Sequence, residues 1–190
     1  KDHHIPPHEI NFRANIDALR EAGVTEIVAI NAVGGIAEGA GPGAIIIPDQ
    51  LIDYTWGRQS TFCGQSKRFV KHVDFSFPFD RALSDRLISA VNAINEQSPA
   101  ARPVMTAGVY GVTQGPRLET AAEIQKMRRD GCDIVGMTAM PEAVLAREAG
   151  INYGLIALSV NWAAGILPSE VTMEEIEVVL ADGNQFLRRV

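Results

Sequence analysis

Apolar positions along this chain follow two alternating spacings. Between residues 7 and 22 they recur about every 3.6 positions, which predicts an amphipathic helix that ends at Gly23. Residues 26–31 then form a short, nearly continuous apolar run, which is typical of a strand buried on both faces. The same alternation continues to the C-terminus. It predicts further strands over residues 44–47, 50–54, 104–112, 133–137 and 152–161, and further helices over residues 81–95, 119–130 and 141–149.

A last helix and one long loop complete the pattern. Thr172 is a candidate N-cap for the last helix, and Glu175 three residues later would form a capping box with it. Residues 57–80 are polar and irregular, and a loop of this length inside a compact domain is usually functional or mobile. Strands and helices that alternate without a linker predict one α/β domain over residues 1–190. Its mixed, twisted central sheet would be flanked by helices, with residues 50–54 at an edge.

Composition and charge restrict the classes of protein that fit. The chain has 190 residues, of which 46% are hydrophobic, enough for the core of one domain. The formal net charge of -6 argues against nucleic acid as a partner, because nucleic acids usually meet a basic face. No apolar run approaches the roughly 20 residues of a membrane helix, so we expect no membrane partner. Cys63 and Cys132 are too few for a disulfide framework, which favours a reducing, cytoplasmic setting.

Candidate chemistry lies where predicted strands end, because ligands of open α/β sheets bind beyond the carboxyl ends of strands. The small residues 31–35 let backbone N–H groups approach an anion, although a tight turn without a ligand explains them equally well. Thr138 offers a hydroxyl, but the residue pattern alone favours a helix cap. Glu119 opens a predicted helix, where the helix dipole by itself favours a carboxylate. Asn161 ends a buried strand, so its amide needs partners.

The histidines raise the question of a metal site. His3, His4 and His8 cluster near the N-terminus, whereas a zinc site needs three or four ligands around a shaped cavity. Neighbouring histidines in a terminal segment do not predict that geometry. The two cysteines show neither metal-binding nor catalytic spacing. We therefore expect no metal.

Several motifs occur in order along almost the whole chain. They are Asn31-Ala-Val-Gly-Gly35, Ile47-Pro-Asp-Gln50, Gly115-Pro-Arg-Leu-Glu-Thr120, Asp133-Ile-Val-Gly-Met-Thr138 and Pro141-Glu-Ala-Val-Leu-Ala146. On these motifs the chain resembles the trimeric purine nucleoside phosphorylases, a family that includes the methylthioadenosine and methylthioinosine phosphorylases. The resemblance implies that phosphate attacks C1′ of a purine nucleoside and that the base leaves. It also implies a homotrimer that uses phosphate as a co-substrate and needs no cofactor.

The resemblance implies a role for each matching residue. Phosphate would be bound at Asn31, Ala32 and Thr138, and by His3, which resembles a histidine near the phosphate and the sugar. Met137 would pack on the ribose. The base pocket would be lined by Leu118, Val135 and Gly136, and the substrate would be selected by Glu119, Asn161 and Ala163.

Glu119 and Asn161 point to 6-oxopurines. Members of the family that use these bases carry Glu and Asn at the two positions, whereas members that use 6-aminopurines place aspartates in the final strand motif, where this chain has Asn161 and Ala163. An ionised Glu119 accepts a hydrogen bond from N1–H of hypoxanthine. Adenine would instead turn a lone pair toward the carboxylate, which costs roughly 1–3 kcal/mol. Asn161 can donate to N7 as negative charge develops on the leaving base.

Two further positions concern the 5′ end of the sugar. Phosphorylases that accept a free 5′-hydroxyl place a histidine where this chain has Ile176, and isoleucine suits a methylthio group instead. His72 falls where related enzymes project a histidine from the neighbouring subunit, so we expect the 57–80 loop to cross a trimer interface. Plain helix packing is the alternative for Ile176. Together these positions predict S-methyl-5′-thioinosine as the nucleoside, ahead of methylthioadenosine and of inosine or guanosine.

One departure from the family concerns the start of the chain. The family's N-terminal strand, its Gly-rich phosphate loop and an Arg-His-Gly motif would all precede Lys1. The phosphorylase domain of residues 1–190 would then lack cationic phosphate ligands, and we expect weak or no activity from these residues alone. A nucleoside-binding domain without phosphorolysis is the non-enzymatic alternative. A Rossmann domain is disfavoured because the GxGxxG fingerprint is absent.

Overall fold

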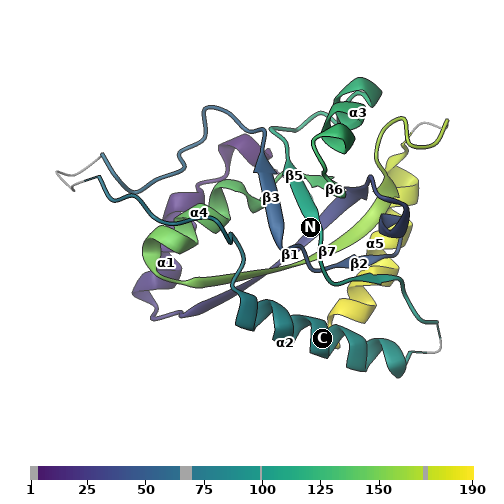
Figure 1. Ribbon diagram of the computed structural model, residues 1–190, viewed down its shortest axis with the longest axis horizontal. Coiled ribbons are helices and arrows are strands. Elements are labelled where there is room, and N and C mark those ends of the chain that lie inside the picture. Colours follow the sequence, from purple (N-terminus) through teal and green to yellow (C-terminus); the bar gives the residue numbers. More distant parts are fainter. Residues whose placement is uncertain (1–3, 65–69, 99, 169–170) are drawn as a thin grey trace.

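The computed structural model describes residues 4–64, 70–98, 100–168 and 171–190 (Figure 1). In these ranges a seven-stranded sheet has the order β3-β5-β6-β1-β7-β2-β4. The strands are β1 (Glu26–Gly35), β2 (Ile45–Ile46), β3 (Gln50–Asp53), β4 (Val104–Met105), β5 (Val109–Val112), β6 (Ile134–Gly136) and β7 (Asn152–Trp162). The helices are α1 (Phe12–Glu21), α2 (Arg81–Glu96), α3 (Ala121–Arg129), α4 (Ala139–Ala149) and α5 (Met173–Leu187). Single 3-10 turns lie at Pro7–Glu9 and Glu38–Ala40.

The long parallel pair β1 and β7 forms the centre of the sheet. The two strands pair from Glu26 with Asn152 to Gly35 with Trp162. β6 runs antiparallel to β1, and β2 runs antiparallel to β7, whereas the outer pairs are parallel. The sheet is therefore mixed, as the sequence predicted. Residues 153–160 of β7 are all buried, which explains why this segment reads as a continuous apolar run.

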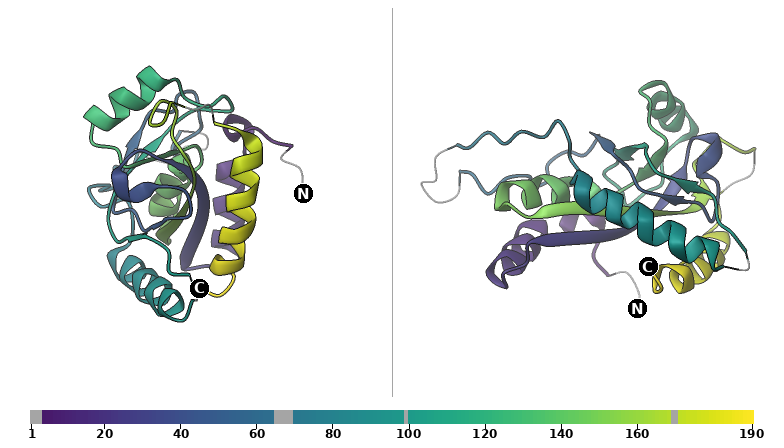
Figure 2. Two further views of the ribbon diagram at one scale, coloured as in Figure 1. Left: turned by 90° about the vertical axis from the view of Figure 1, so that its right-hand side faces the viewer. Right: turned by 60° about the horizontal axis from the view of Figure 1, so that its bottom comes forward.

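Helices cover the sheet in separate groups. Residues of α1 and α4 pack with β1 and β7 in one core cluster, and residues of α2 and α5 pack with β2 and β7 in another. Helix α3 stands at the opposite end of the molecule from α2 (Figures 1 and 2). It contributes Ile124 and Met127 to a smaller third cluster with Cys132. The predicted α/β architecture is confirmed, and Cys132 is a packing residue, as expected.

One predicted strand is in fact two. The segment over residues 104–112 leaves the sheet between Met105 and Val109, so β4 pairs with β2 at one edge while β5 lies beside β3 near the other. Two carboxylates support the crossing. Asp49 accepts a hydrogen bond from the backbone N–H of Gly108 at 2.9 Å, and Asp133 accepts one from that of Val109 at 2.8 Å.

Caps explain where several helices differ from the predicted ranges. Helix α1 begins only at Phe12, because the Asn11 side chain accepts a hydrogen bond from the Ala14 N–H at 3.0 Å. Helix α3 begins after Glu119, because Thr120 and Glu123 form a capping box. Thr172 caps α5 as predicted, with the backbone N–H of Glu175 as its donor, but the Glu175 side chain does not return a bond to the Thr172 N–H, so the predicted capping box is incomplete.

Residues 57–64 and 70–79 form an extended arm between β3 and α2 that passes beyond α4 (Figures 1 and 2). Glu148 of α4 accepts hydrogen bonds from the Thr61 hydroxyl at 2.6 Å and from the Phe62 N–H at 2.7 Å. Arg147 donates to the backbone oxygens of Asp74 and Phe77. The irregular stretch predicted for residues 57–80 is therefore confirmed over residues 57–64 and 70–80, and both of these segments are attached to one end of α4. Residues 65–69 lie outside the described residues.

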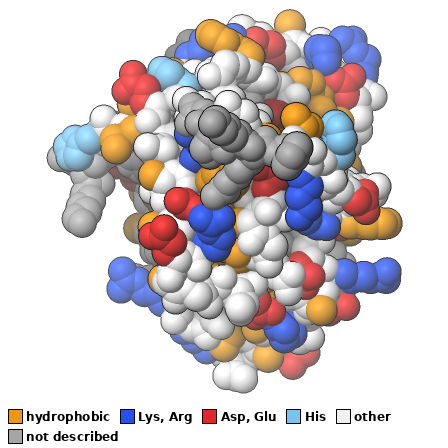
Figure 3. Space-filling view, turned by 90° about the vertical axis from the view of Figure 1, so that its left-hand side faces the viewer, with side chains coloured by type: hydrophobic (Ala, Val, Ile, Leu, Met, Phe, Trp, Pro, Cys, Tyr) orange, Lys and Arg blue, Asp and Glu red, His pale blue; other side chains and the backbone are white. Residues whose placement is uncertain are grey.

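The surface is mixed in charge where the arm projects. Figure 3 shows acidic and basic side chains interspersed on that face. In the part of the chain that the structure describes, no helix is both long and apolar enough to cross a membrane.

Candidate functional site

A cavity of about 640 Å³ lies around the second half of β1, the end of β6 and the end of β7. It collects residues from four motifs that lie far apart in the sequence. The predicted site residues on its wall are Asn31, Ala32, Val135, Met137, Thr138 and Asn161. His4, Ile5 and Pro7 lie on the wall as well, so the N-terminal segment that precedes α1 closes part of this cavity.

A buried hydrogen-bond network forms the floor of this cavity. The Asn31 amide donates to the Tyr110 hydroxyl at 3.2 Å and to the Thr138 hydroxyl at 3.0 Å. Burial raises the pKa of Tyr110 to about 12, so its phenol stays neutral at physiological pH. Thr138 makes no capping bond to α4, so the helix-cap interpretation is wrong. Because the Thr138 oxygen accepts from Asn31, its O–H remains a donor that can turn to Tyr110 or to an anion.

A β-bulge lies beside Asn161 on the wall of the same cavity. Val33 pairs with Ser159, but Gly34 pairs with Asn161, so the register skips Val160. Residues in register across a parallel pair share a face, so Asn161 shares the face of Ala32 and not that of Asn31. Asn31 and Ala32 both line the cavity, so residues from both faces of β1 contribute to its wall.

The amide of Asn161 is only partly used. It donates one hydrogen bond, of 2.7 Å, to the backbone oxygen of Trp162. A primary amide has two N–H donors and an acceptor oxygen. One donor and the oxygen therefore remain for a ligand.

The wall of this cavity carries little charge. His4 is the one titratable side chain among its described lining residues, which include no carboxylate and no lysine or arginine. An anion here would meet backbone groups, a hydroxyl and amides. Such neutral donors can bind an anion without the repulsion that a carboxylate would add.

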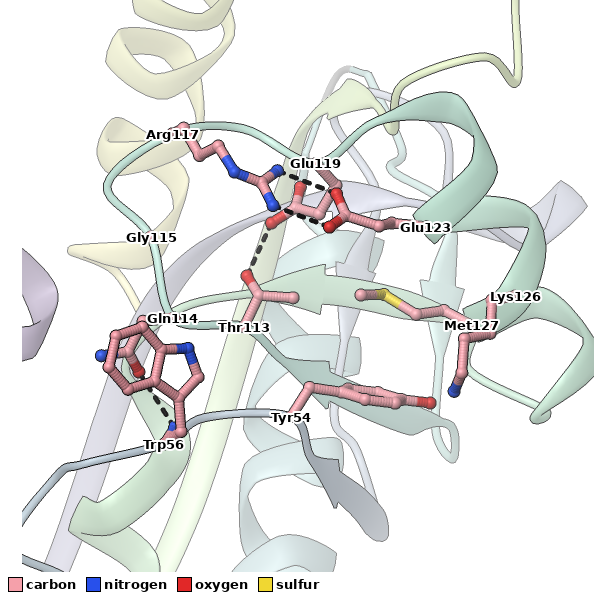
Figure 4. Close-up of a pocket in the computed structure, with 10 residues that line it drawn as sticks. All are labelled: Tyr54, Trp56, Thr113, Gln114, Gly115, Arg117, Glu119, Glu123, Lys126 and Met127. Atoms are coloured by element: carbon pink, nitrogen blue, oxygen red, sulfur yellow. Dashed lines mark hydrogen bonds and ion pairs between the residues drawn. The ribbon is translucent and has the colours of Figure 1, made fainter.

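A second cavity, of about 350 Å³, has the opposite character (Figure 4). Its wall carries Arg117, Glu119, Glu123 and Lys126, together with Tyr54, Trp56, Thr113 and Met127. Arg117 donates to both carboxylate oxygens of Glu123, at 2.7 and 2.8 Å. These bonds are the main reason that the pKa of Glu123 falls to about 2.

Glu119 has a different partner in this second cavity. Its Oε1 accepts a hydrogen bond of 2.6 Å from the hydroxyl of Thr113 (Figure 4). Thr113 follows β5 directly, and its side chain is buried. Glu119 therefore stands over the end of β5, one residue before the Thr120 cap of α3.

The loop of residues 115–119 separates the two cavities. Gly115 lines the second cavity and Pro116 the first. Gly115 has a φ of +61°, and a Cβ there would lie 2.5 Å from the sulfur of Met137, so only glycine fits. Glu119 and Asn161, which the sequence assigned to one base, thus line different cavities on either side of this loop.

The other predicted base-pocket residues are dispersed. Leu118 is 46% exposed and lies outside both cavities. Gly136 lies against Tyr110, whose hydroxyl oxygen would be 2.1 Å from a Cβ at that position. Ala163 is buried and lines a smaller cavity of about 290 Å³, which Asn161 also lines.

The residues assigned to the 5′ end and to phosphate by resemblance lie elsewhere. Ile176 is partly buried and packs against the core cluster of α2 and α5, which is the contact that plain helix packing predicts. Its neighbours Glu175 and Val179 line the cavity of about 290 Å³ together with Asn161. His72 is exposed on the arm. His3 lies outside the described residues.

Arg58, at the start of the arm, is the polar residue most closely attached to the site. Its guanidinium donates to the backbone oxygens of Met137 (2.7 Å), Met140 (2.6 Å), Thr113 (3.1 Å) and Gln114 (2.8 Å), and to the Gln114 side chain (3.2 Å). Burial lowers its pKa, and the charge of Asp53 opposes that shift. Arg58 therefore joins the end of β5 to the segment between β6 and α4, and so one cavity to the other.

Sequence reasoning missed Tyr110, Thr113 and Arg58. Tyr110 lies inside an apolar strand, where nothing in the sequence sets it apart from a core residue. Thr113 is a polar residue directly after a strand, and the rule that selected Asn161 and Thr138 could have found it. Arg58 lies in a long polar loop, where neither its spacing nor its neighbours distinguish it from solvent-exposed residues. Across the described ranges no three His, Cys, Asp or Glu side chains converge as metal ligands would.

Comparison with known proteins gives a consistent result. The family model described as the phosphorylase superfamily matches residues 2–190. A probable S-methyl-5′-thioinosine phosphorylase from Xanthomonas campestris is 51% identical over 175 residues, covering 92% of this chain and 68% of that protein. A 6-oxopurine nucleoside phosphorylase from Pyrococcus furiosus is 43% identical over 181 residues, covering 93% of this chain and 66% of that protein.

Solved structures agree on the fold. A mutant adenosine/methylthioadenosine phosphorylase from Schistosoma mansoni, in complex with tubercidin, superimposes with a TM-score of 0.91 at 33% identity. The match covers all of this chain and 72% of that protein. A methylthioadenosine phosphorylase from the same organism, in complex with adenine, gives a TM-score of 0.89 at 32% identity, covering 97% of this chain and 69% of that one.

Proposed function

The chain belongs to the phosphorylase superfamily, and from this premise we propose that it converts S-methyl-5′-thioinosine and phosphate into hypoxanthine and 5-methylthioribose 1-phosphate. The observation that carries the proposal is the first cavity. It gathers Asn31, Met137, Thr138 and Asn161 around a space with no carboxylate among its described lining residues. Such a space accommodates an anionic nucleophile beside a sugar and a base.

The neutral donors support the phosphate end of the reaction. Backbone groups at Asn31 and Ala32 and the hydroxyl of Thr138 would bind phosphate, with His3 as a further contact. Met137 would pack on the ribose. A phosphate oxygen then forms a bond to C1′ while the bond between C1′ and N9 breaks, and the purine leaves with the electron pair.

Asn161 would act on the leaving base. As the C1′–N9 bond breaks, negative charge accumulates on the purine, and the unused amide N–H of Asn161 can donate to N7. A donor directed at developing charge lowers the barrier more than it strengthens substrate binding. Val135 would line the base pocket beside it, and Leu118, Gly136 and Ala163 are assigned to the same pocket by resemblance.

By resemblance, Glu119 supports the choice of a 6-oxopurine, although in this structure it lines the second cavity and not the first. Its carboxylate can accept from N1–H of hypoxanthine, whereas adenine offers no proton at N1. The names of the relatives agree with a 6-oxopurine, since those named as probable S-methyl-5′-thioinosine phosphorylases are 41–52% identical and those named for 6-oxopurine nucleosides 42–43%. A methylthioadenosine phosphorylase is the second candidate, favoured by the similar Schistosoma mansoni structures at 32–33% identity.

The remaining assignments belong to the same proposal. Ile176 would provide an apolar neighbour for the methylthio group, and His72 would reach the site of an adjacent subunit in a homotrimer. The enzyme would work in the cytoplasm with phosphate as co-substrate and without a cofactor or metal. The exposed position of His72 on the extended arm fits such a reach.

A phosphorolysis assay on the protein expressed from its complete gene tests this function. Release of the free base is followed with methylthioinosine, methylthioadenosine and inosine, each with and without phosphate. We expect phosphate-dependent turnover that is fastest with methylthioinosine. Faster turnover of methylthioadenosine would contradict the hypothesis that Glu119 and Asn161 select a 6-oxopurine. Equal turnover of inosine and methylthioinosine would contradict the hypothesis that Ile176 selects a methylthio group. Nucleoside binding without turnover would favour a binding protein instead.

A further inference from the structure

We propose that Thr113 is a positioning residue that sets the preference for 6-oxopurines by holding the carboxylate of Glu119. This inference rests on the proposed role of Glu119 in base recognition. Its structural basis is the hydrogen bond of 2.6 Å from the Thr113 hydroxyl to Oε1 of Glu119 (Figure 4).

The position of Thr113 is set by the sheet and not by its hydroxyl. The Thr113 backbone N–H donates to the backbone oxygen of Gly136 at 2.8 Å, directly beyond the last β5–β6 pair. The side chain is 8% exposed, so neighbouring atoms restrict its movement. The hydroxyl therefore extends from a fixed backbone toward the 115–119 loop.

The hydroxyl proton has two acceptors within reach. Oε1 of Glu119 lies at 2.6 Å and the backbone oxygen of Gly136 at 3.3 Å. A hydroxyl carries one proton, and a bond to a carboxylate is shorter and stronger than one to a carbonyl. The proton therefore goes to Glu119. The Gly136 oxygen already has the backbone N–H of Thr113 as a donor, so it does not need the hydroxyl.

The bond leaves Glu119 half used. Oε2 of Glu119 accepts no hydrogen bond from the residues that the structure describes, and the terminal nitrogens of Arg117 donate instead to Glu123 and to the backbone oxygen of Leu118. One carboxylate oxygen is thus fixed, and the other is presented as an acceptor. An acceptor held in one orientation discriminates between a base with N1–H and a base with a lone pair at N1.

The hydroxyl also restrains the loop that separates the cavities. Gly115 packs against Met137 at one end of this loop, and Thr113 binds Glu119 at the other. Loss of the hydroxyl would leave Glu119 free to rotate with its whole side chain. The cost would then fall on substrates that donate to the carboxylate and not on those that do not.

Four variants of the full protein test the proposal: Thr113→Val, Thr113→Ser, Glu119→Gln, and Thr113→Val combined with Glu119→Gln. The measurement is kcat/KM for methylthioinosine and for methylthioadenosine. We expect Thr113→Val to lower the ratio of kcat/KM for methylthioinosine to kcat/KM for methylthioadenosine about tenfold, mostly by raising KM for methylthioinosine. Thr113→Ser should restore the ratio, since it keeps the hydroxyl. Thr106→Val, a similar change at an exposed residue after β4, is the matched control.

The outcomes separate this inference from the function on which it rests. If Glu119→Gln collapses the ratio and Thr113→Val leaves it unchanged, Thr113 has no positioning role, and the inference fails alone. If Glu119→Gln also leaves the ratio unchanged, the recognition role of Glu119 fails with it. If Thr113 acts through Glu119, the double variant should be no worse than Glu119→Gln. Equal losses for both nucleosides in Thr113→Val, with a lowered melting temperature, would mark a structural role and overturn the inference.

Discussion

The two cavities on either side of the 115–119 loop are built from opposite chemistry. The first cavity, lined by Asn31, Thr138 and Asn161, offers hydroxyl and amide groups, with His4 as its titratable residue. The second cavity is lined by the carboxylates of Glu119 and Glu123 and by the cations of Arg117 and Lys126. The protein has a net charge of -6, yet its described carboxylates are kept off the wall of the first cavity. An acidic protein can thus receive an anion by the local placement of its charges.

The strongest way to break this contrast is to remove Asn161 from the neutral cavity. Asn161→Ala deletes the donor proposed for N7, and loss of one such donor typically lowers kcat about 100- to 1000-fold. We expect a much smaller change in KM, because the interaction forms with the developing charge. Steady-state kinetics with methylthioinosine measure both parameters. Asn184→Ala, at an exposed position on α5, is the control and should keep full activity. A change in KM alone would show that Asn161 only binds the ground state.

Arg58 joins the two cavities, so its removal should affect both. Arg58→Ala leaves up to four backbone oxygens without this donor, and we expect a loss of about 2–4 kcal/mol in the free energy of unfolding. Arg58→Lys keeps the charge but lacks the planar fork, so it should recover only part of the stability. Urea denaturation measures the effect. Arg129→Ala, exposed at the end of α3, should be near neutral, and a similarly small effect of Arg58→Ala would show that the guanidinium is dispensable.

A smaller effect is expected from Asn31, which organises the floor of the neutral cavity. Asn31→Ala removes the donor to Tyr110 and Thr138, and the Thr138 hydroxyl then loses its orientation. We expect KM for phosphate to rise roughly tenfold while KM for the nucleoside changes little. Kinetics with phosphate as the varied substrate measure this. Equal increases for both substrates would mean that Asn31 supports the whole cavity and not the phosphate end.

The smallest effect concerns the ion pair of the charged cavity. Arg117→Ala removes both bonds to Glu123, so the pKa of Glu123 should rise from about 2 toward its unfolded value of 4.5. A lowered folded pKa stabilises the native state fully above pH 4.5, and this contribution is lost as the pH falls toward 2. Because the pair is largely exposed, we expect only a small loss in the free energy of unfolding at neutral pH. The free energy of unfolding of the unchanged protein and of Arg117→Ala, measured between pH 3 and 7, gives the difference. A difference that stays the same at every pH would contradict a cause in the pKa of Glu123.

The spacing of apolar residues was enough to predict most of the helices and strands and the segments that carry the candidate chemistry. Helices and strands follow the spacing of apolar residues, because one face of each element must be buried. Asn161 stands out near the end of β7 and Thr138 just beyond β6, because a buried strand rarely ends in Asn or Thr. The prediction that the first strand ends at Asn31 is wrong, since β1 continues to Gly35, and residues 31–35 are strand and not a tight turn. Those same motifs carried the resemblance to the phosphorylase family, which the comparisons confirmed.

Only the tertiary structure decided how these residues meet. Asn31 and Thr138 are 107 positions apart, and Arg58 lies 79 positions from Met137, so no local pattern records their hydrogen bonds. The skipped pairing at Val160 that places Asn161 on the face of Ala32 depends on the register with β1, which a single strand does not carry. The separation of Glu119 from Asn161 depends on a loop packed against Met137. Spacing in a sequence encodes burial of each element, whereas a site depends on contacts that exist only once the elements have packed.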